Sequence, residues 1–397
     1  MLIGVVGKPN VGKSTFFQAL TMAPTQRANY PFTTIEANRG VGHVEIECVD
    51  KDFDTKCNPR YGSCTDSRRF VPVELIDVAG LVPGAHEGKG LGNKFLDDLR
   101  QADALIHVID ASGSANENGE SVKMGTYDPC NDVEFLEEEL NFWILGILTK
   151  NWKKLSRFET STTKTKTAIL IEQMSGLGVK EQHIDESLRR LNLRDKKMID
   201  WSEQELMNFA IEIRKTSKPI VIAANKCDLP TAEENIKKLE KKFPDYIIVA
   251  TSAETELALK EANKKGYIKY LPGDNHVEII KELDEKQKKA IEFIDKNILK
   301  KYEGTGVQKC INAAVFDLLH YIAVFPGGVN KLADSEGNVL PDVWLFPPNS
   351  TALDFAARIH KDMAEKFIKA INVRTKMPLG ADYKLKHRDV LEIMFGR

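Results

Sequence analysis

Residues 7–14 read GKPNVGKS, which fits the phosphate-binding pattern GxxxxGK[ST]. An apolar run over residues 1–6 precedes this loop and is typical of a buried strand, and residues 15–20 are predicted to form a helix. Glycines let the backbone approach an anion closely, and a helix N-terminus presents N–H groups to phosphate oxygens. The stretch therefore predicts a nucleoside-triphosphate site, in which Lys13 reaches the outer phosphates and Ser14 ligates Mg²⁺.

A second polar sequence, DVAG at residues 77–80, follows a buried-strand pattern over residues 71–76. An acidic residue and a glycine at a strand end suit the metal side of such a site. We expect the carboxylate of Asp77 to hold Mg²⁺ through its water shell, and the N–H of Gly80 to face the terminal phosphate.

A third sequence, NKCD at residues 225–228, follows an apolar run over residues 219–224. Asp228 would accept hydrogen bonds from the N1–H and amino group of guanine, Lys226 would cover the ring, and Asn225 would tie the loop down. A carboxylate only accepts, so it favours guanine over adenine by leaving polar groups unpaired in the wrong complex. The backbone of residues 251–253, after the next predicted strand, could contact the guanine O6.

These patterns together predict GTP or GDP as ligand and Mg²⁺ as cofactor. The residues expected to contact the nucleotide are Gly7, Lys8, Pro9, Asn10, Val11, Gly12, Lys13, Ser14, Thr15, Asn225, Lys226, Asp228, Ser252 and Ala253.

Length and composition narrow the class of protein. A chain of 397 residues predicts two or three domains. The net charge of −2 gives no support for DNA binding, so any nucleic-acid surface would have to be a local patch. No apolar run approaches a membrane span, and no signal peptide is recognisable, which predicts a cytoplasmic protein without a membrane partner. The six scattered cysteines are expected to be reduced thiols; Cys57 and Cys64 could form half of a metal site, but no second pair follows at ligand spacing.

The order of patterns predicts an α/β fold with additions. Residues 1–130 and 215–275 would form the nucleotide-binding domain, and residues 131–214 a helical insertion with many basic residues. Residues 276–324 would form a helical connector. Residues 325–397 would form a small α+β module, with a turn at Gly337 and Asn338, an amphipathic helix over residues 353–370 and a closing strand over residues 389–394.

The sequence resembles a known family at several places. GKPNVGKS, NYPFTTIEANRG (29–40), DVAGLVPGA (77–85), GLGNKFL (90–96) and NKCD together resemble the Obg-like GTPases of the YchF branch, particularly its archaeal members. The tail PDVWLFPPNSTALDFAARIH (341–360) with VRTKMPLGADYKLKHRDVLEIMF (373–395) is similar to a TGS domain, a β-grasp module. The resemblance implies a P-loop GTPase domain, with a mostly parallel sheet covered by helices on both faces, and a role near the ribosome, with ribosomal or transfer RNA as a partner.

The resemblance also implies roles for residues near the phosphates. Thr34, or alternatively Thr33, would be the switch threonine that closes on Mg²⁺, so Lys13, Thr34 and Gly80 are the expected catalytic groups. Leu81 stands where Ras-like proteins have a water-positioning glutamine, which predicts slow intrinsic hydrolysis. Asn10 occupies the position at which some related proteins hold K⁺, and a possible K⁺ cofactor follows from it.

Two other functions remain open at this point. Bacterial and eukaryotic YchF proteins prefer ATP and lack a good NKxD sequence, whereas Asn225, Lys226 and Asp228 are all present here. An ATPase of that kind is one alternative. An RNA-binding adaptor with a static structural nucleotide is the other.

Overall fold

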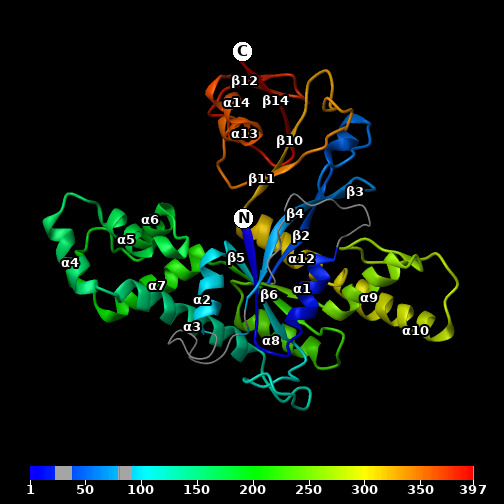
Figure 1. Cartoon of the computed structure of the whole chain (residues 1–397). Coiled ribbons are helices and arrows are strands. Elements are labelled where there is room, and N and C mark those ends of the chain that lie inside the picture. The colour runs from blue at the N-terminus through cyan, green and yellow to red at the C-terminus, as the bar shows by residue number, and fades with distance from the viewer. Residues whose placement is uncertain (23–37, 79, 81–91, 397) are drawn as a thin grey trace. The chain divides into compact units, whose positions relative to one another are not determined.

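The computed structural model describes residues 1–22, 38–78, 80 and 92–396. The chain forms two compact units. Unit 1 consists of Met1–Ala19, Glu36–Gly40 and Glu74–Cys310, and unit 2 consists of Leu20–Ile35, Val41–Val73 and Ile311–Arg397. The predicted mixed α/β fold is confirmed (Figure 1).

The main sheet is built mostly from parallel strands, of which β1, β5, β6 and β7 lie in unit 1. The order of the main sheet is β2-β4-β1-β5-β6-β7, with β3 paired antiparallel to β4. The strands β1 and β4, β1 and β5, β5 and β6, and β6 and β7 are paired parallel. Their bounds are β1 Leu2–Val6, β2 Arg39–Glu47, β3 Ser63–Thr65, β4 Arg68–Asp77, β5 Ala104–Asp110, β6 Ile220–Asn225 and β7 Ile247–Ala250.

The central strands are covered on both faces. All residues of β1, β5 and β6 are buried, which is the pattern of a parallel sheet with helices on either side. The helices that pack around the sheet or follow it in the chain are α1 Lys13–Thr21, α2 Gly92–Gln101, α3 Cys130–Thr149, α7 Glu203–Ser217, α8 Ala232–Lys242, α9 Ala253–Lys264, α10 Glu285–Ile294, α11 Lys300–Tyr302 and α12 Val307–Asn312. A short hairpin of β8 Ile268–Lys269 and β9 Glu278–Ile279 follows α9.

The predicted helical region after β5 contains α3, α4 Trp152–Ser161, α5 Lys166–Met174, α6 Glu181–Arg190 and α7. In Figure 1, α4, α5 and α6 lie to one side of the sheet. Leu140 of α3, Leu170 of α5 and Phe209 of α7 belong to the same buried cluster as Leu105 of β5. The inserted helices and the sheet therefore share one continuous hydrophobic core.

Unit 2 contains a five-stranded sheet of order β11-β10-β14-β12-β13. Its elements are β10 Ile322–Pro326, β11 Trp344–Phe346, α13 Ala352–Ile359, α14 Lys361–Glu365, β12 Phe367–Asn372, β13 Pro378–Leu379 and β14 Asp389–Phe395. Phe355 of α13 packs against Val324 of β10 and Leu391 of β14 to form a small core. The turn at Gly337 closes a short bridge between Ala333 and Val339.

The prediction of a single helix over residues 353–370 is wrong for its second half. The helix α13 ends at Ile359, where His360 adopts an extended conformation, and the short helix α14 follows. Residues 367–372 form β12, which pairs antiparallel with β14. Long-range strand pairing buries Ala370 and overrides the local helical pattern.

Within the described residues, no helix combines the length and the apolar character needed to cross a membrane.

Candidate nucleotide site

The loop after β1 has a backbone that depends on glycine. Gly12 has a φ of +90°, and a Cβ atom added there would lie 2.4 Å from Nδ2 of Asn225. Asn10 also has a positive φ, of 63°, which asparagine tolerates better than most residues. The helix α1 begins at Lys13, immediately after this turn, so the N–H groups of its first turn, which a helix leaves without intrahelical partners, are suited to bind an anion.

Asn225 links three segments that are distant in sequence. Its Nδ2 donates to the carbonyl of Val11 at 2.9 Å, and its Oδ1 accepts from the N–H of Ala253 at 3.0 Å. The side chain is 3% exposed. The phosphate loop, the end of β6 and the start of α9 are therefore held together by one buried amide.

Lys226, the next residue of the same motif, is also anchored by hydrogen bonds. Its Nζ donates to the carbonyl of Asn10 at 3.1 Å and to Oδ2 of Asp110 at 2.8 Å. Burial alone would raise the pKa of Asp110, but hydrogen bonds from Lys226, Ser112 and Ser114 together lower it. The ionised carboxylate of Asp110, at the end of β5, thus fixes the direction of the lysine stem.

These segments enclose a cavity of about 400 Å³. It is lined by Lys8, Pro9, Asn10, Gly12, Lys13, Ser14, Thr15, Asn225, Lys226, Asp228, Leu229, Ser252, Ala253 and Glu254. Twelve of the residues expected to contact a nucleotide therefore line one cavity, with the phosphate loop and Asp228 both in its wall. Leu229 and Glu254 were not expected; each directly follows a predicted site residue in sequence.

The expected Mg²⁺ ligands provide the appropriate chemistry. Lys13 forms an ion pair with Asp77 at the end of β4, and Ser14 follows Lys13 at the start of α1. Hydroxyl and carboxylate oxygens are the ligands that Mg²⁺ prefers, so Ser14 and Asp77 fit this ion. Bound there, Mg²⁺ would neutralise charge on the terminal phosphates.

Lys8 has a role that sequence reasoning missed. Its Nζ donates to Oδ1 of Asp132 at 2.8 Å and to the carbonyl of Ala115 at 3.0 Å, and it lies 3.8 Å from the ring centroid of Tyr127. Both charged side chains are almost fully buried. Although Lys8 lines the cavity, its ammonium group anchors the phosphate loop to the start of α3.

The segment after β5 contacts the phosphate loop as well. The Nδ2 of Asn10 donates to the carbonyl of Gly119 at 2.8 Å. Gly119 has a φ of +77°, and a Cβ atom there would lie 2.6 Å from the carbonyl oxygen of Pro9. The predicted K⁺ ligand is therefore held by its amide nitrogen, which leaves Oδ1 as the atom able to ligate a cation.

A buried hydrogen-bond network around Glu256 holds the segment 251–253 in place. Glu256 is fully buried and accepts from the hydroxyls of Tyr270 at 2.6 Å and Thr305 at 2.5 Å. The carbonyl of Thr305 in turn accepts from the N–H of Ser252 at 2.9 Å. The sequence did not predict this network, because Tyr270 and Thr305 belong to no recognisable motif.

Several predicted residues lie outside the described part of the chain. These are Thr33, Thr34 and Leu81. Gly80 is described and lies near the phosphate loop, since a Cβ atom there would be 3.6 Å from Cγ of Pro9.

Comparisons with known proteins identify the family. Family models match for a 50S ribosome-binding GTPase over residues 2–133, for the G4 motif-containing domain of an Obg-like GTPase, YGR210-like, over residues 223–328, and for a TGS domain over residues 336–395. An uncharacterised GTP-binding protein of Methanocaldococcus jannaschii is 52% identical, covering 99% of this chain and 98% of that protein. The chain belongs to the Obg-like GTPases of the YchF type. The predicted family, P-loop fold and TGS domain are thereby confirmed.

Two further members of this family show how far the similarity extends. A GTP-binding protein of Pyrococcus horikoshii has a solved structure with a TM-score of 0.80 and 38% identity, and the match covers all of both chains. A Mycoplasma genitalium protein named ribosome-binding ATPase YchF is 30% identical over 92% of this chain and 86% of its own length. Some members of the family are therefore named as GTP-binding proteins and others as ATPases.

We expect the buried pair of Lys8 and Asp132 to be needed for a stable phosphate loop. Removing one partner of a buried ion pair costs about 3–5 kcal/mol, because the other charge stays buried and unpaired. Lys8→Met should lower the free energy of unfolding by that amount in urea denaturation. The double variant Lys8→Met/Asp132→Leu should recover at least about half of the loss.

An exposed lysine provides the matched control for this experiment. Lys237 pairs with Glu233 on the surface of α8, so Lys237→Met should change the free energy of unfolding by less than about 1 kcal/mol. A loss of the same size in Lys8→Met and Lys237→Met would contradict the anchoring role of Lys8.

Proposed function

We propose that this chain binds GTP in preference to ATP, hydrolyses it slowly to GDP and phosphate, and acts as a Mg²⁺-dependent conformational switch. The observation that carries the proposal is the shared cavity, in whose wall Asp228 and the phosphate loop both lie. Asn225 and Lys226, which precede Asp228 in the same sequence motif, are hydrogen-bonded directly to that loop. This arrangement supports simultaneous recognition of a guanine base and a phosphate chain.

The proposed roles follow the chemistry of each residue. Lys13 stabilises charge on the β- and γ-phosphates, Ser14 and Thr34 ligate Mg²⁺, and Asp77 holds the water shell of the ion. Gly80 senses the γ-phosphate. The other residues expected to contact the nucleotide bind its phosphates and base. Leu81 carries no hydrogen-bonding group to orient water, which supports slow turnover.

The division of labour along the chain is also a proposal. Residues 1–130 and 215–275 would bind GTP, with residues 131–214 as a helical insertion, 276–324 as a connector and 325–397 as the TGS domain. We infer that the helical and TGS segments contact ribosomal or transfer RNA in the cytoplasm. The names of relatives such as the ribosome-binding ATPase of Mycoplasma genitalium support a ribosomal partner.

We expect guanine preference to depend on Asp228. Titration of labelled GDP, a GTP analogue and an ATP analogue should show tighter binding of both guanine nucleotides to the wild-type chain. Asp228→Ala should weaken guanine binding about a hundredfold or more, because it removes two charge-assisted hydrogen bonds. ATP-analogue binding should change little.

Asp228→Asn is the sharper variant, because an amide can donate a hydrogen bond to the 2-oxo group of xanthine. It should gain affinity for xanthosine diphosphate while it loses affinity for GDP. Equal or tighter ATP binding by the wild-type chain would contradict the GTP assignment and favour an ATPase of the bacterial YchF type.

We expect potassium to stimulate hydrolysis through Asn10. The single-turnover rate of GTP hydrolysis should be higher in K⁺ than in Na⁺ at equal ionic strength, and Asn10→Ala should remove the difference. Equal rates in the two salts would contradict a cation site at Asn10.

We expect ribosome binding to depend on the bound nucleotide. Co-sedimentation with ribosomal subunits should differ at least about tenfold in affinity between the states with GTP analogue and GDP, since allosteric couplings are typically of this size. Equal binding in every nucleotide state would support the RNA-binding adaptor instead.

A further inference from the structure

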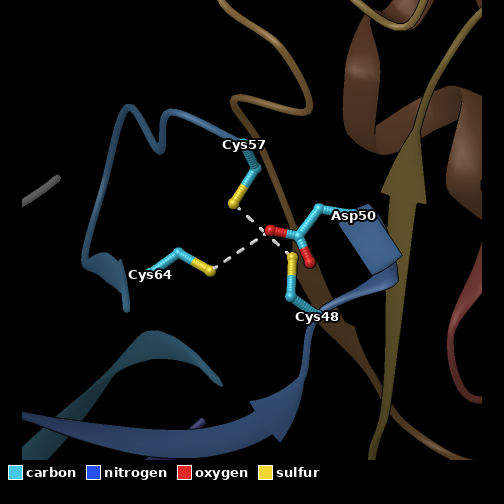
Figure 2. Close-up of side chains that lie close together, drawn as sticks. All are labelled: Cys48, Asp50, Cys57 and Cys64. Atoms are coloured by element: carbon cyan, nitrogen blue, oxygen red, sulfur yellow. Dashed lines mark hydrogen bonds between the residues drawn. The ribbon is translucent and has the colours of Figure 1, made fainter. Parts of the chain in front are cut away.

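Four potential metal ligands from residues 48–64 gather in unit 2. The Sγ atoms of Cys48, Cys57 and Cys64 and a carboxylate oxygen of Asp50 all lie within 4.8 Å of one another (Figure 2). The figure shows their side chains converging on a common centre. Sequence spacing alone pointed to Cys57 and Cys64 and missed the other two, which precede them in the chain.

The spacing of these atoms fits a metal ion better than a disulfide. The Sγ atoms of Cys48 and Cys57 are 3.5 Å apart, and Sγ of Cys64 is 3.9 Å from Oδ2 of Asp50. Two thiolates that bind one tetrahedral zinc at about 2.3 Å have their sulfurs about 3.8 Å apart. A disulfide would require a sulfur–sulfur distance of about 2.05 Å.

Asp50 provides an independent indication of a ligand. The residue is only 4% exposed, and among the described residues its Oδ1 has no hydrogen-bond partner. A buried carboxylate without compensation is costly, and coordination of a cation is one of the few ways to offset that cost. Because Asp50 faces three thiols, the compensating group is a cation that accepts both sulfur and oxygen.

We propose that Cys48, Asp50, Cys57 and Cys64 bind one Zn²⁺ ion. Thiolates select soft or borderline metals, and zinc accepts a carboxylate as the remaining ligand. Four protein ligands complete a tetrahedron and leave no open position, so the site is structural. It is independent of the nucleotide function, because its ligands lie in unit 2 and the nucleotide cavity lies in unit 1.

Two of the four ligands lie in regular elements, and a third directly follows one. Cys48 directly follows β2, Asp50 lies in the 3₁₀ helix Val49–Phe53, and Cys64 lies in β3. The N–H of Cys48 donates to the carbonyl of Ser67 at 2.7 Å, which closes the β2 end onto the β3–β4 turn. Such placement is expected of a preorganised site, because little chain has to move when the ion binds.

A buried arginine next to the cluster offsets its charge. Arg69 is the register partner of Cys64 across the β3–β4 ladder, so the two side chains leave the same face. Its guanidinium is fully buried and donates to the carbonyls of Leu340 at 3.1 Å and Pro341 at 2.8 Å. Three thiolates, one carboxylate and Zn²⁺ carry a net negative charge, which the arginine partly neutralises.

The ion would fix the loop that carries Cys57. The N–H groups of Asn58 and Arg60 donate to the carbonyls of Val339 at 3.0 Å and Pro341 at 2.9 Å. The loop turns at Gly62, whose φ is +71° and where a Cβ atom would lie 2.0 Å from the carbonyl of Phe70. Zinc bound to Cys57 would therefore hold this loop next to the hydrogen bonds that it forms with the start of the segment matching the TGS domain, residues 336–395.

The test begins with metal content. The full-length chain, purified without an affinity tag or chelator, should contain about one zinc per chain by mass spectrometry of the metal. Cys57→Ser and Cys64→Ser should lose the zinc, whereas Cys130→Ser, which changes a buried thiol in unit 1, should retain it. GDP affinity of each variant shows whether unit 1 remains folded.

Cobalt and Asp50→Asn test the ligand set directly. Co²⁺ added to the metal-free chain under reducing conditions should give thiolate charge-transfer absorption and the intense visible bands of a tetrahedral site. Cys57→Ser, which removes one of the three thiolates, should give little of this absorption at the cobalt concentration that saturates the wild-type chain. Asp50→Asn should keep the charge-transfer intensity, because all three thiolates remain. It should weaken zinc binding at least about tenfold, since the loss of a group that only hydrogen-bonds to a metal ligand already has an effect of this size.

Two results would overturn the proposal. One is a wild-type chain that contains no zinc and gives no tetrahedral cobalt spectrum while its thiols are reduced. The other is a disulfide between Cys48 and Cys57 in the freshly purified protein, detected by peptide mass spectrometry.

Discussion

The geometry of the nucleotide site depends on the amide of Asn225. It accepts from Ala253 and donates to Val11, so it fixes the distance between the loop that would hold phosphate and the loops that would hold the base. Parallel strands make this possible, because the carboxyl ends of β1, β6 and β7 reach the same edge of the sheet. A buried amide suits the task, since it offers a donor and an acceptor without the desolvation cost of a charge.

Around this amide, three carboxylates direct the lysines. Asp110 holds Lys226, Asp77 pairs with Lys13, and Asp132 at the start of α3 holds Lys8. The pairs differ in burial: Lys8 and Asp132 are almost fully buried, whereas Lys13 and Asp77 are more accessible to solvent. Burial favours a permanent structural contact for the first pair. Accessibility leaves Lys13 able to exchange its carboxylate for a phosphate.

In the cysteine cluster of unit 2, as in the candidate nucleotide site, the surrounding structure positions the polar side chains. A strand end, a helical turn and a strand bring Cys48, Asp50 and Cys64 together, and a loop supplies Cys57. In both units, hydrogen bonds, ion pairs and strand register position these polar side chains. Preorganisation of this kind reduces the entropy lost on binding, whether the ligand is a nucleotide or a metal ion.

Sequence alone determined the family, the P-loop fold and the local motifs, because GKPNVGKS and NKCD are contiguous and each follows an apolar strand. Only the tertiary structure decided which side chains from distant parts of the sequence contact these motifs. The anchoring of Lys8 on Asp132, the Glu256 network behind Ser252 and the joining of Asp50 to three cysteines arise from segments brought together by packing. The strand β12 shows the same limit, since residues 367–370 follow a helical pattern locally and become part of a strand by pairing with β14. Local propensities are weak compared with long-range pairing and burial, so contacts between distant residues cannot be derived from spacing.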